Sequence, residues 1–332
     1  MPEMTTYGES HVANGKLAPA RTARVVGLGH RLPDTVVPNG PIAERIGVDA
    51  EWIVRRTGIR ERRHAAPDER TADLAVAAAR RALSDAQRKP SDVDLVLVAT
   101  MTPDELTPNT APLVADALGL QVGAFDVGAA CTGWLSALSL GAAQIETGRA
   151  ECVLVIGAET ISRITNPDDK RTAALFGDGA GAVVLGPEGE GAIGPIVLAS
   201  DGSMAETITA NHTDRLLIMD GHTTFNKAVK VLVESTEQAL DRAGVTLDDI
   251  DVFVYHQANS RILKSVAERL GLPDERVADY VGETGNTSAA SIPLTLSLLR
   301  EDGRLRPGQR LLLAAVGAGF TWGAGVVEWG VS

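Results

Sequence analysis

The chain has 332 residues, of which 44% are hydrophobic and 22% charged, a composition that is ordinary for a folded protein. Its net charge of −12 at pH 7 argues against nucleic acid as the main partner, because phosphate binding depends on lysine and arginine. No apolar run approaches the roughly 18 to 20 residues that cross a membrane, and residues 1–20 are too polar for a secretory signal, so we expect a cytoplasmic protein with no membrane partner and a flexible tail over residues 1–21.

Helical and strand patterns alternate along the first half of the chain. Residues 71–86 have the apolar spacing of a helix, and residues 92–100 form a β-rich run. A second helix is predicted near residues 111–119, and a strand follows at residues 123–127. This alternation favours an α/β fold with mostly buried strands.

The same pattern returns 157 residues later in the sequence. Three pairs of matched positions keep this distance: Asp94 with Asp251, Cys131 with Ser288, and Val153 with Arg310. Three pairs of segments with the same separation along the sequence are hard to explain by chance. We therefore predict two homologous α/β halves, residues 22–190 and 191–332. In such a pseudo-symmetric pair, we expect any site to lie where the halves meet.

Cys131 stands after the segment VGAA, where a strand is expected to end and a helix to begin. Unpaired backbone N–H groups at a helix start, together with the helix dipole, stabilise a thiolate and are expected to lower the pKa of the thiol. A lone cysteine is more often an inert core residue, which is how we interpret Cys152 inside the apolar run CVLVIGA. Two cysteines and six scattered histidines offer neither a disulfide framework nor a zinc site, so we expect no metal.

Two polar residues of the second half are candidates to act with this thiol. His256 stands in YHQANSRI, at the end of a predicted strand, where open α/β sheets bind ligands. Asn286 stands in GETGNTSAAS, just before a predicted helix, and taken alone it is an ordinary N-cap. However, Asn286 lies beside Ser288, the repeat partner of Cys131, so two-fold symmetry brings both helix starts towards one site.

Two glycine-rich segments have different interpretations. Residues 314–325, AAVGAGFTWGAG, follow an apolar strand, and their glycines would let backbone N–H groups form an oxyanion hole, a tight hairpin, or both. Residues 176–186, FGDGAGAVVLG, lack the Gly-Lys-Ser/Thr ending of a phosphate loop and lead into a strand. We interpret this second segment as a structural turn.

From about residue 22 onward, six motifs in order resemble the β-ketoacyl-acyl carrier protein synthase III enzymes, condensing enzymes of the thiolase fold. These are EWIVRRTGIRERR, the Cys131 segment, FGDGAGAVVLG, HQANSRI, GNTSAAS and GFTWG. The resemblance implies a five-layered αβαβα architecture from two duplicated halves, a homodimer, and a catalytic site of Cys131, His256 and Asn286. It also implies decarboxylative condensation of an acyl-CoA with malonyl-acyl carrier protein through an acyl-cysteine, in fatty acid biosynthesis, with no metal or redox cofactor.

The same resemblance assigns expected roles to further residues. The oxyanion hole would use the backbone N–H groups of Cys131 and Ala318. Coenzyme A would contact Trp52, Arg56, Lys170 and Asn259, and the acidic carrier protein would contact Arg261, Lys264 and Arg269, although the last two can equally form a solvated helix face.

The sequence also departs from the family pattern at several positions. Lys170, followed by Arg171, stands where many relatives have the arginine that stacks on adenine, His222 replaces an asparagine, and Ala318 interrupts a glycine triplet. Thr107 takes the place of a phenylalanine that in some relatives closes the acyl pocket from the neighbouring subunit. We hypothesise that the smaller side chain leaves room for a longer or branched acyl group.

Two alternative functions stay open at this point. The first is a pathway-specific relative that primes a polyketide or transfers an acyl group to oxygen or nitrogen. Asn286 favours decarboxylative condensation, since plain acyl transfer has no malonyl enolate to stabilise, but its presence does not exclude a pathway-specific enzyme. A non-catalytic partner subunit could dispense with its cysteine, whereas this chain keeps all three polar residues. The identity of the acyl donor is left open.

Overall fold

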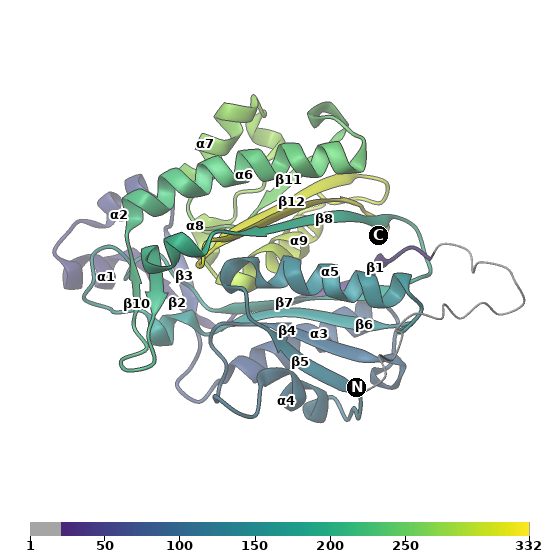
Figure 1. The fold of residues 1–332 in the computed structure, drawn as a ribbon. Helices are drawn as coiled ribbons and strands as arrows, with labels where there is room; N and C mark the ends of the chain where they lie inside the picture. The colour runs from purple at the N-terminus through teal and green to yellow at the C-terminus, as the bar shows by residue number, and fades with distance from the viewer. Residues whose placement is uncertain (1–20, 332) are drawn as a thin grey trace, which may run out of the picture.

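The computed structural model describes residues 21–331, which form two mixed β-sheets (Figure 1). The first sheet has the strand order β1 (Arg24–Arg31), β7 (Gly179–Gly186), β6 (Val153–Glu159), β4 (Leu95–Ala99), β5 (Gly123–Val127). The second has the order β8 (Ala192–Ser200), β13 (Thr321–Glu328), β12 (Arg310–Gly317), β11 (Val252–Tyr255). In the first sheet β4 is parallel to both β5 and β6, and in the second β11 is parallel to β12; the other pairs are antiparallel.

Helices make three layers around these two sheets, and the five-layered αβαβα arrangement is confirmed (Figure 1). The outer face of the first sheet is covered by α3 (Thr71–Asp85) and α4 (Thr110–Ala117), and the outer face of the second by α6 (Gly221–Ala243) and α7 (Ser260–Leu270). Between the sheets lie α5 (Gly133–Glu146) and α9 (Ser291–Glu301). The apolar spacing predicted for residues 71–86 and 111–119 therefore belongs to two helices that cover one sheet.

Small residues let the central layer pack closely against the first sheet. A Cβ atom on Gly157 of β6 would come within 2.3 Å of the Ala289 carbonyl oxygen, and one on Gly181 of β7 within 2.4 Å of the Leu294 nitrogen. Real side chains cannot approach backbone atoms so closely, so glycine is required at both positions. This close approach brings the segment that leads into α9 against the strands of the first half.

The repeat seen in the sequence recurs in the positions of the elements. β11 begins 157 residues after β4, and β12 begins 157 residues after β6. Short 3₁₀ turns, η2 (Ala130–Thr132) and η7 (Ser288–Ala290), precede α5 and α9, and the two turns pack against each other. Among the described residues, β5 has no counterpart in the second sheet. The proposed boundary near residue 190 falls between β7 and β8 and stays a prediction.

Smaller elements surround the two sheets, and several lie together at one end of the molecule (Figure 1). They are β2 (Thr35–Pro38), α1 (Asn39–Ile46), α2 (Ala50–Thr57), β3 (Glu61–His64), η1 (Pro90–Asp92), η3 (Ile161–Ile164), η4 (Gly202–Thr207), β9 (Ile208–Ala210), β10 (Leu217–Met219), η5 (Leu247–Asp249), η6 (Asp274–Arg276) and α8 (Val281–Thr284). Two antiparallel pairs, β2 with β3 and β9 with β10, are separate from the main sheets. None of the helices in residues 21–331 is both long enough and apolar enough to cross a membrane.

Candidate active site

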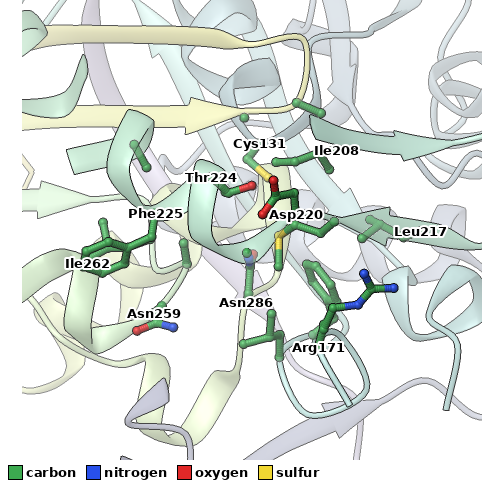
Figure 2. A pocket seen from close by; sticks show the side chains of 18 of the residues that line it. Cys131, Arg171, Ile208, Leu217, Asp220, Thr224, Phe225, Asn259, Ile262 and Asn286 are labelled. Atoms are coloured by element: carbon green, nitrogen blue, oxygen red, sulfur yellow. The ribbon is translucent and has the colours of Figure 1, made fainter. Parts of the chain in front are cut away.

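A cavity of about 870 Å³ opens where the two halves meet, and Cys131, His256 and Asn286 all line it. Cys131 comes from η2, His256 from the residue after β11, and Asn286 from the segment before η7. Figure 2 shows Cys131 and Asn286 at the centre of this space. The structure therefore brings together the three residues that the sequence singled out, although they are far apart along the chain.

The Cys131 side chain is half-buried at the cavity, and the surroundings do not favour its thiolate. The pKa of the Cys131 thiol is raised to about 12, mainly by burial; a hydrogen bond with the Ser288 side chain lowers it, and the negative charge of Glu159 raises it, and both effects are smaller than that of burial. The expectation that the helix start lowers this pKa is therefore wrong. The free energy lost by removing water from a thiolate outweighs what the local N–H dipoles return.

His256 is 2% exposed and directly follows β11. Its backbone N–H donates to the Ala314 carbonyl of β12 at 2.8 Å, which fixes the start of the loop. Burial lowers the pKa of His256 to about 4, so the imidazole is neutral near pH 7. A neutral imidazole keeps one N–H group that can donate a hydrogen bond, and the buried Nδ1 atom has no partner among the described residues.

Asn286 is 7% exposed and is held by bonds on both its backbone and its side chain. Its backbone N–H donates to the Leu175 carbonyl at 2.9 Å, and its Oδ1 atom accepts from the Ser288 N–H at 2.9 Å. The N-cap of η7 is Thr287 and not Asn286, so the N-cap interpretation is wrong, although the bond from the Ser288 N–H resembles one that an N-cap side chain accepts. Because Oδ1 is engaged by the backbone, the side-chain nitrogen is the group left to donate towards the cavity.

The glycine-rich segment forms the tight hairpin between β12 and β13, and Ala318 in its turn lines the cavity. A Cβ atom on Gly317 would come within 2.8 Å of the Cys131 nitrogen, so only glycine lets this turn lie so close to η2. The Thr132 and Thr321 hydroxyls, 2.7 Å apart, join the turn to η2. The hairpin is thus confirmed, and the backbone of Ala318 is held near the nucleophile candidate.

The residues predicted to contact coenzyme A lie together on the wall of the cavity. Trp52, Arg56, Lys170 and Asn259 all line it. The Arg56 guanidinium carbon and the Lys170 Nζ atom lie 5.0 Å and 4.9 Å from the centroid of the Trp52 ring. Asn259 caps α7, accepts from the Arg261 N–H at 2.8 Å and donates to the Arg56 carbonyl at 3.4 Å. This arrangement joins α2 and α7 beside the cavity.

Of the remaining predicted residues, some line the cavity and some do not. His222 and Arg261 line the cavity, and the Arg261 guanidinium carbon lies 5.4 Å from the Phe225 ring centroid. Lys264 and Arg269 lie further along α7 and do not line it. Thr107 does not line the cavity of the single chain either; it is exposed, in the loop before α4. Within one chain, Thr107 is therefore not placed to contact an acyl group in this cavity.

Sequence reasoning missed the apolar wall of the cavity. Figure 2 shows Ile208 and Leu217 on one side of Cys131 and Phe225 and Ile262 on the other. Segments far apart in sequence supply the apolar cluster beside the thiol: Ile161, Phe176 and Leu217, with Met101, Ile164, Leu175, Ile208 and Met219 packed against them. No short motif carries a signal for such a wall.

Glu159 was also missed, although it ends the apolar strand β6. Its side chain is 0% exposed, and burial raises the pKa of its carboxyl to about 7. The signal that could have found it is an acidic residue at the end of VLVIGAE, a run expected to be buried on both faces. A buried acid at a strand end, next to the candidate cysteine, marks a functional region.

Comparison with known proteins gives one consistent answer. Residues 125–202 match the family model described as 3-oxoacyl-acyl-carrier-protein synthase III, and residues 240–329 match the model of its C terminal. The chain is 47% identical to β-ketoacyl-acyl-carrier-protein synthase III 3 of Streptomyces coelicolor, over 93% of this chain and 98% of that protein.

Solved structures agree with these matches. The β-ketoacyl-acyl-carrier-protein synthase III of Thermus thermophilus is 43% identical with a TM-score of 0.89, over 93% of this chain and 100% of that one. The priming β-ketosynthase of the R1128 polyketide pathway is 38% identical with a TM-score of 0.90, over 96% of this chain and 100% of that one.

Proposed function

Because the chain belongs to the β-ketoacyl-acyl carrier protein synthase III family of thiolase-fold condensing enzymes, which are acyltransferases, we propose that it condenses an acyl-CoA primer with malonyl-acyl carrier protein in fatty acid biosynthesis. The product is a β-ketoacyl-acyl carrier protein. The observation that carries this proposal is a single cavity, lined by Cys131, His256 and Asn286, with an apolar wall beside the thiol.

The first half-reaction is acyl transfer to Cys131. The sulfur, after losing its proton, attacks the thioester carbon of the acyl-CoA, and coenzyme A leaves as a thiolate. The oxyanion that forms is held by the backbone N–H groups of Cys131 and Ala318, which the close approach of Gly317 to η2 supports. The acyl chain lies against the apolar wall, and the site needs no metal or redox cofactor for this step.

The second half-reaction is decarboxylation of the malonyl group. Loss of carbon dioxide leaves an enolate, whose oxygen accepts hydrogen bonds from His256 Nε2 and the Asn286 side-chain amide. A neutral imidazole suits this role, and the low pKa of His256 keeps it neutral. The carbanion then attacks the acyl-Cys131 carbon, and the cysteine sulfur leaves.

Substrate contacts outside the reaction centre are proposed from the same cavity. Coenzyme A is held by four residues that line the cavity, Trp52, Arg56, Lys170 and Asn259, with the cations near its phosphates. Carrier protein, which is acidic, docks on the cationic side chains of α7, namely Arg261, Lys264 and Arg269.

The direct test is mass spectrometry of the intact enzyme after exposure to a mixture of acyl-CoAs. We expect one acyl group per chain on Cys131, and release of a β-ketoacyl product when malonyl-carrier protein is added. Transfer of the acyl group to an alcohol or amine with no loss of carbon dioxide would contradict condensation. Failure of every acyl-CoA to label Cys131 would contradict the donor class.

The same panel of acyl-CoAs tests the role of Thr107. We expect initial rates with C4 to C12 or branched acyl-CoAs to exceed the rate with acetyl-CoA, because a threonine leaves space where a phenylalanine would close the pocket. Thr107→Phe should shift the preference towards acetyl-CoA. A wild-type enzyme that clearly prefers acetyl-CoA would refute the hypothesis.

We further propose that the enzyme is a homodimer joined along β5. In the described sheet β5 is an edge strand, and edge strands pair readily with a second chain. Large apolar side chains are exposed on and beside it: Phe125 on β5 at 45%, Leu140 on α5 at 46%, and Leu106 in the loop before α4 at 68%. Because Thr107 follows Leu106, this interface would carry Thr107 towards the partner's cavity.

Phe125→Glu is expected to convert the dimer to a monomer, because it buries a charge at the centre of the proposed interface. The measurement is molar mass by size-exclusion chromatography with light scattering. Val36→Glu is the matched control, because Val36 on β2 is 43% exposed but lies outside the β5 edge. A dimer that survives Phe125→Glu would place the interface elsewhere.

A second candidate function is the priming of a specialised pathway such as a polyketide. It is supported by the likeness to the R1128 priming β-ketosynthase, whose TM-score of 0.90 is within 0.01 of that of the Thermus thermophilus enzyme. Both functions use the same two half-reactions, so only the acyl group and the carrier protein distinguish them. Rates with a fatty-acid carrier protein against a polyketide carrier protein separate the two.

A further inference from the structure

The two half-reactions leave Glu159 without a role. Its side chain is completely buried, and it accepts hydrogen bonds from five groups. The donors are the hydroxyls of Thr102 at 2.6 Å, Ser288 at 2.9 Å and Thr100 at 3.2 Å, and the backbone N–H groups of Met101 at 3.2 Å and Ala289 at 3.4 Å. No described lysine, arginine or histidine forms an ion pair with it. A buried acid with no cation costs stability, so its presence calls for a chemical reason.

Ser288 connects this acid to the nucleophile. Its hydroxyl donates to Glu159 Oε1 at 2.9 Å and also forms a hydrogen bond with the Cys131 side chain. The backbone at Ser288 has a φ of 50°, in the left-handed region that a residue with a side chain rarely adopts. This conformation is held by the contact of η7 with β6 and η2, and by the bond from the Ser288 N–H to Asn286.

The charged and titratable groups around Glu159 are few. The end of β4 contributes hydroxyl and backbone groups only, η7 contributes Ser288 and Ala289, and η2 contributes the Cys131 thiol. Of these, only Cys131 titrates, and the charge of Glu159 raises the pKa of that thiol. The protonation of Glu159 and that of Cys131 therefore affect each other, and the Ser288 hydroxyl lies between the two groups.

We propose that Glu159 is the proton acceptor of Cys131, through Ser288. This proposal rests on the proposed function for its place in the cycle. Glu159 touches neither substrate nor sulfur, so it is a positioning residue that acts through Ser288. Because the proton moves from the thiol to the carboxylate, the pair carries one negative charge throughout: the charge lies on Glu159 before the transfer and on the Cys131 sulfur after it.

Each proton that moves in this cycle has a donor and an acceptor. Before acylation, Ser288 passes its hydroxyl proton to Glu159 and takes the thiol proton, which leaves the electron pair on the sulfur of Cys131. The thiolate forms a bond with the thioester carbon, and coenzyme A leaves as a thiolate that takes a proton from water. After condensation, the cysteine sulfur leaves as a thiolate, and Glu159 returns its proton through Ser288. No oxidant, metal or further base is required.

The proposal is tested by the rate at which iodoacetamide alkylates Cys131, measured by peptide mass from pH 6 to pH 9. In the wild-type enzyme we expect the rate to rise through pH about 7, where Glu159 loses its proton, and then to level off. In Glu159→Gln and in Ser288→Ala we expect no levelling near pH 7 and a rate at pH 7.5 at least about tenfold lower. Cys152, which is 3% exposed and has a pKa raised by burial to about 11, serves as an internal reference thiol.

Two further measurements separate the relay from a structural role. Decarboxylation of malonyl-carrier protein needs no thiolate, so it should stay within about threefold in Glu159→Gln, and Glu159→Asp should restore part of the alkylation rate. Unchanged alkylation in Glu159→Gln would overturn the relay, as would equal losses of alkylation and decarboxylation with a lower melting temperature. Because iodoacetamide needs no acyl-CoA, a failure of the proposed donor class leaves this test intact.

Discussion

Replacing Cys131 by alanine is expected to abolish acyl-enzyme formation and to lower condensation by on the order of 10⁴-fold or more, because no other described nucleophile lines the reaction centre in its place. Decarboxylation of malonyl-carrier protein should persist within about tenfold, since the enolate is stabilised by His256 and Asn286 and the thiol takes no part in that step. The measurements are the mass of the intact enzyme with acyl-CoA, and the release of carbon dioxide with malonyl-carrier protein.

Cys152→Ala provides the matched control for this substitution. Cys152 is 3% exposed, precedes β6, and does not line the cavity, so its removal should leave both half-reactions unchanged. Condensation that survives Cys131→Ala would mean that the acyl group passes directly from coenzyme A to the carbanion. Loss of decarboxylation along with condensation would mean that the substitution disturbs the hydrogen-bond donors, and the two half-reactions could then not be assigned separately.

The alternation and the repeat were sufficient to predict an α/β fold of two similar halves, because these signals are local and repeated, whereas the five-layered arrangement was implied by the resemblance to the family. The alternation of helical and strand periods predicted strands at residues 92–100 and 123–127, and the structure has β4 and β5 there, although only β4 is buried and β5 is a partly exposed edge strand. The distance of 157 residues between matched positions survives in β4 and β11, because both halves fold by the same rules. That repeat also placed Ser288 opposite Cys131, and the two turns that carry them pack together.

The features that the sequence did not predict depend on many contacts between residues that are far apart along the chain. The pKa of Cys131 depends mainly on how far the surrounding protein shields the thiol from water. The residues next to Cys131 in the sequence do not indicate this burial, so the rule about helix starts predicted a shift in the wrong direction. The apolar wall is built from several separate segments around Ile161, Phe176 and Leu217. Glu159 looked like an ordinary strand end until its five hydrogen-bond donors were placed around it in three dimensions.

Removing either proposed enolate donor is expected to lower malonyl decarboxylation about 10²-fold, since one such donor contributes about 3 kcal/mol to the barrier. His256→Ala and Asn286→Ala should both leave acylation of Cys131 within about tenfold, because the acyl group meets the backbone oxyanion hole and not these side chains. The double variant should lose less than the product of the two single effects, because both donors share one oxygen atom. Release of carbon dioxide and the intact mass after acyl-CoA exposure measure the two half-reactions separately.

Conservative variants sharpen this prediction and give the sign of its pH dependence. His256→Gln keeps a donor nitrogen and should lose less activity than His256→Ala, whereas Asn286→Asp places a negative charge beside the enolate and should lose more than Asn286→Ala. Because burial lowers the pKa of His256 to about 4, the imidazole stays neutral from pH 8 down to pH 5, and wild-type decarboxylation should show no inflection from His256 near pH 6.5. An inflection at that pH that disappears in His256→Gln would show that the imidazole is protonated during decarboxylation, and the enolate would then be stabilised by a charge and not by a neutral donor.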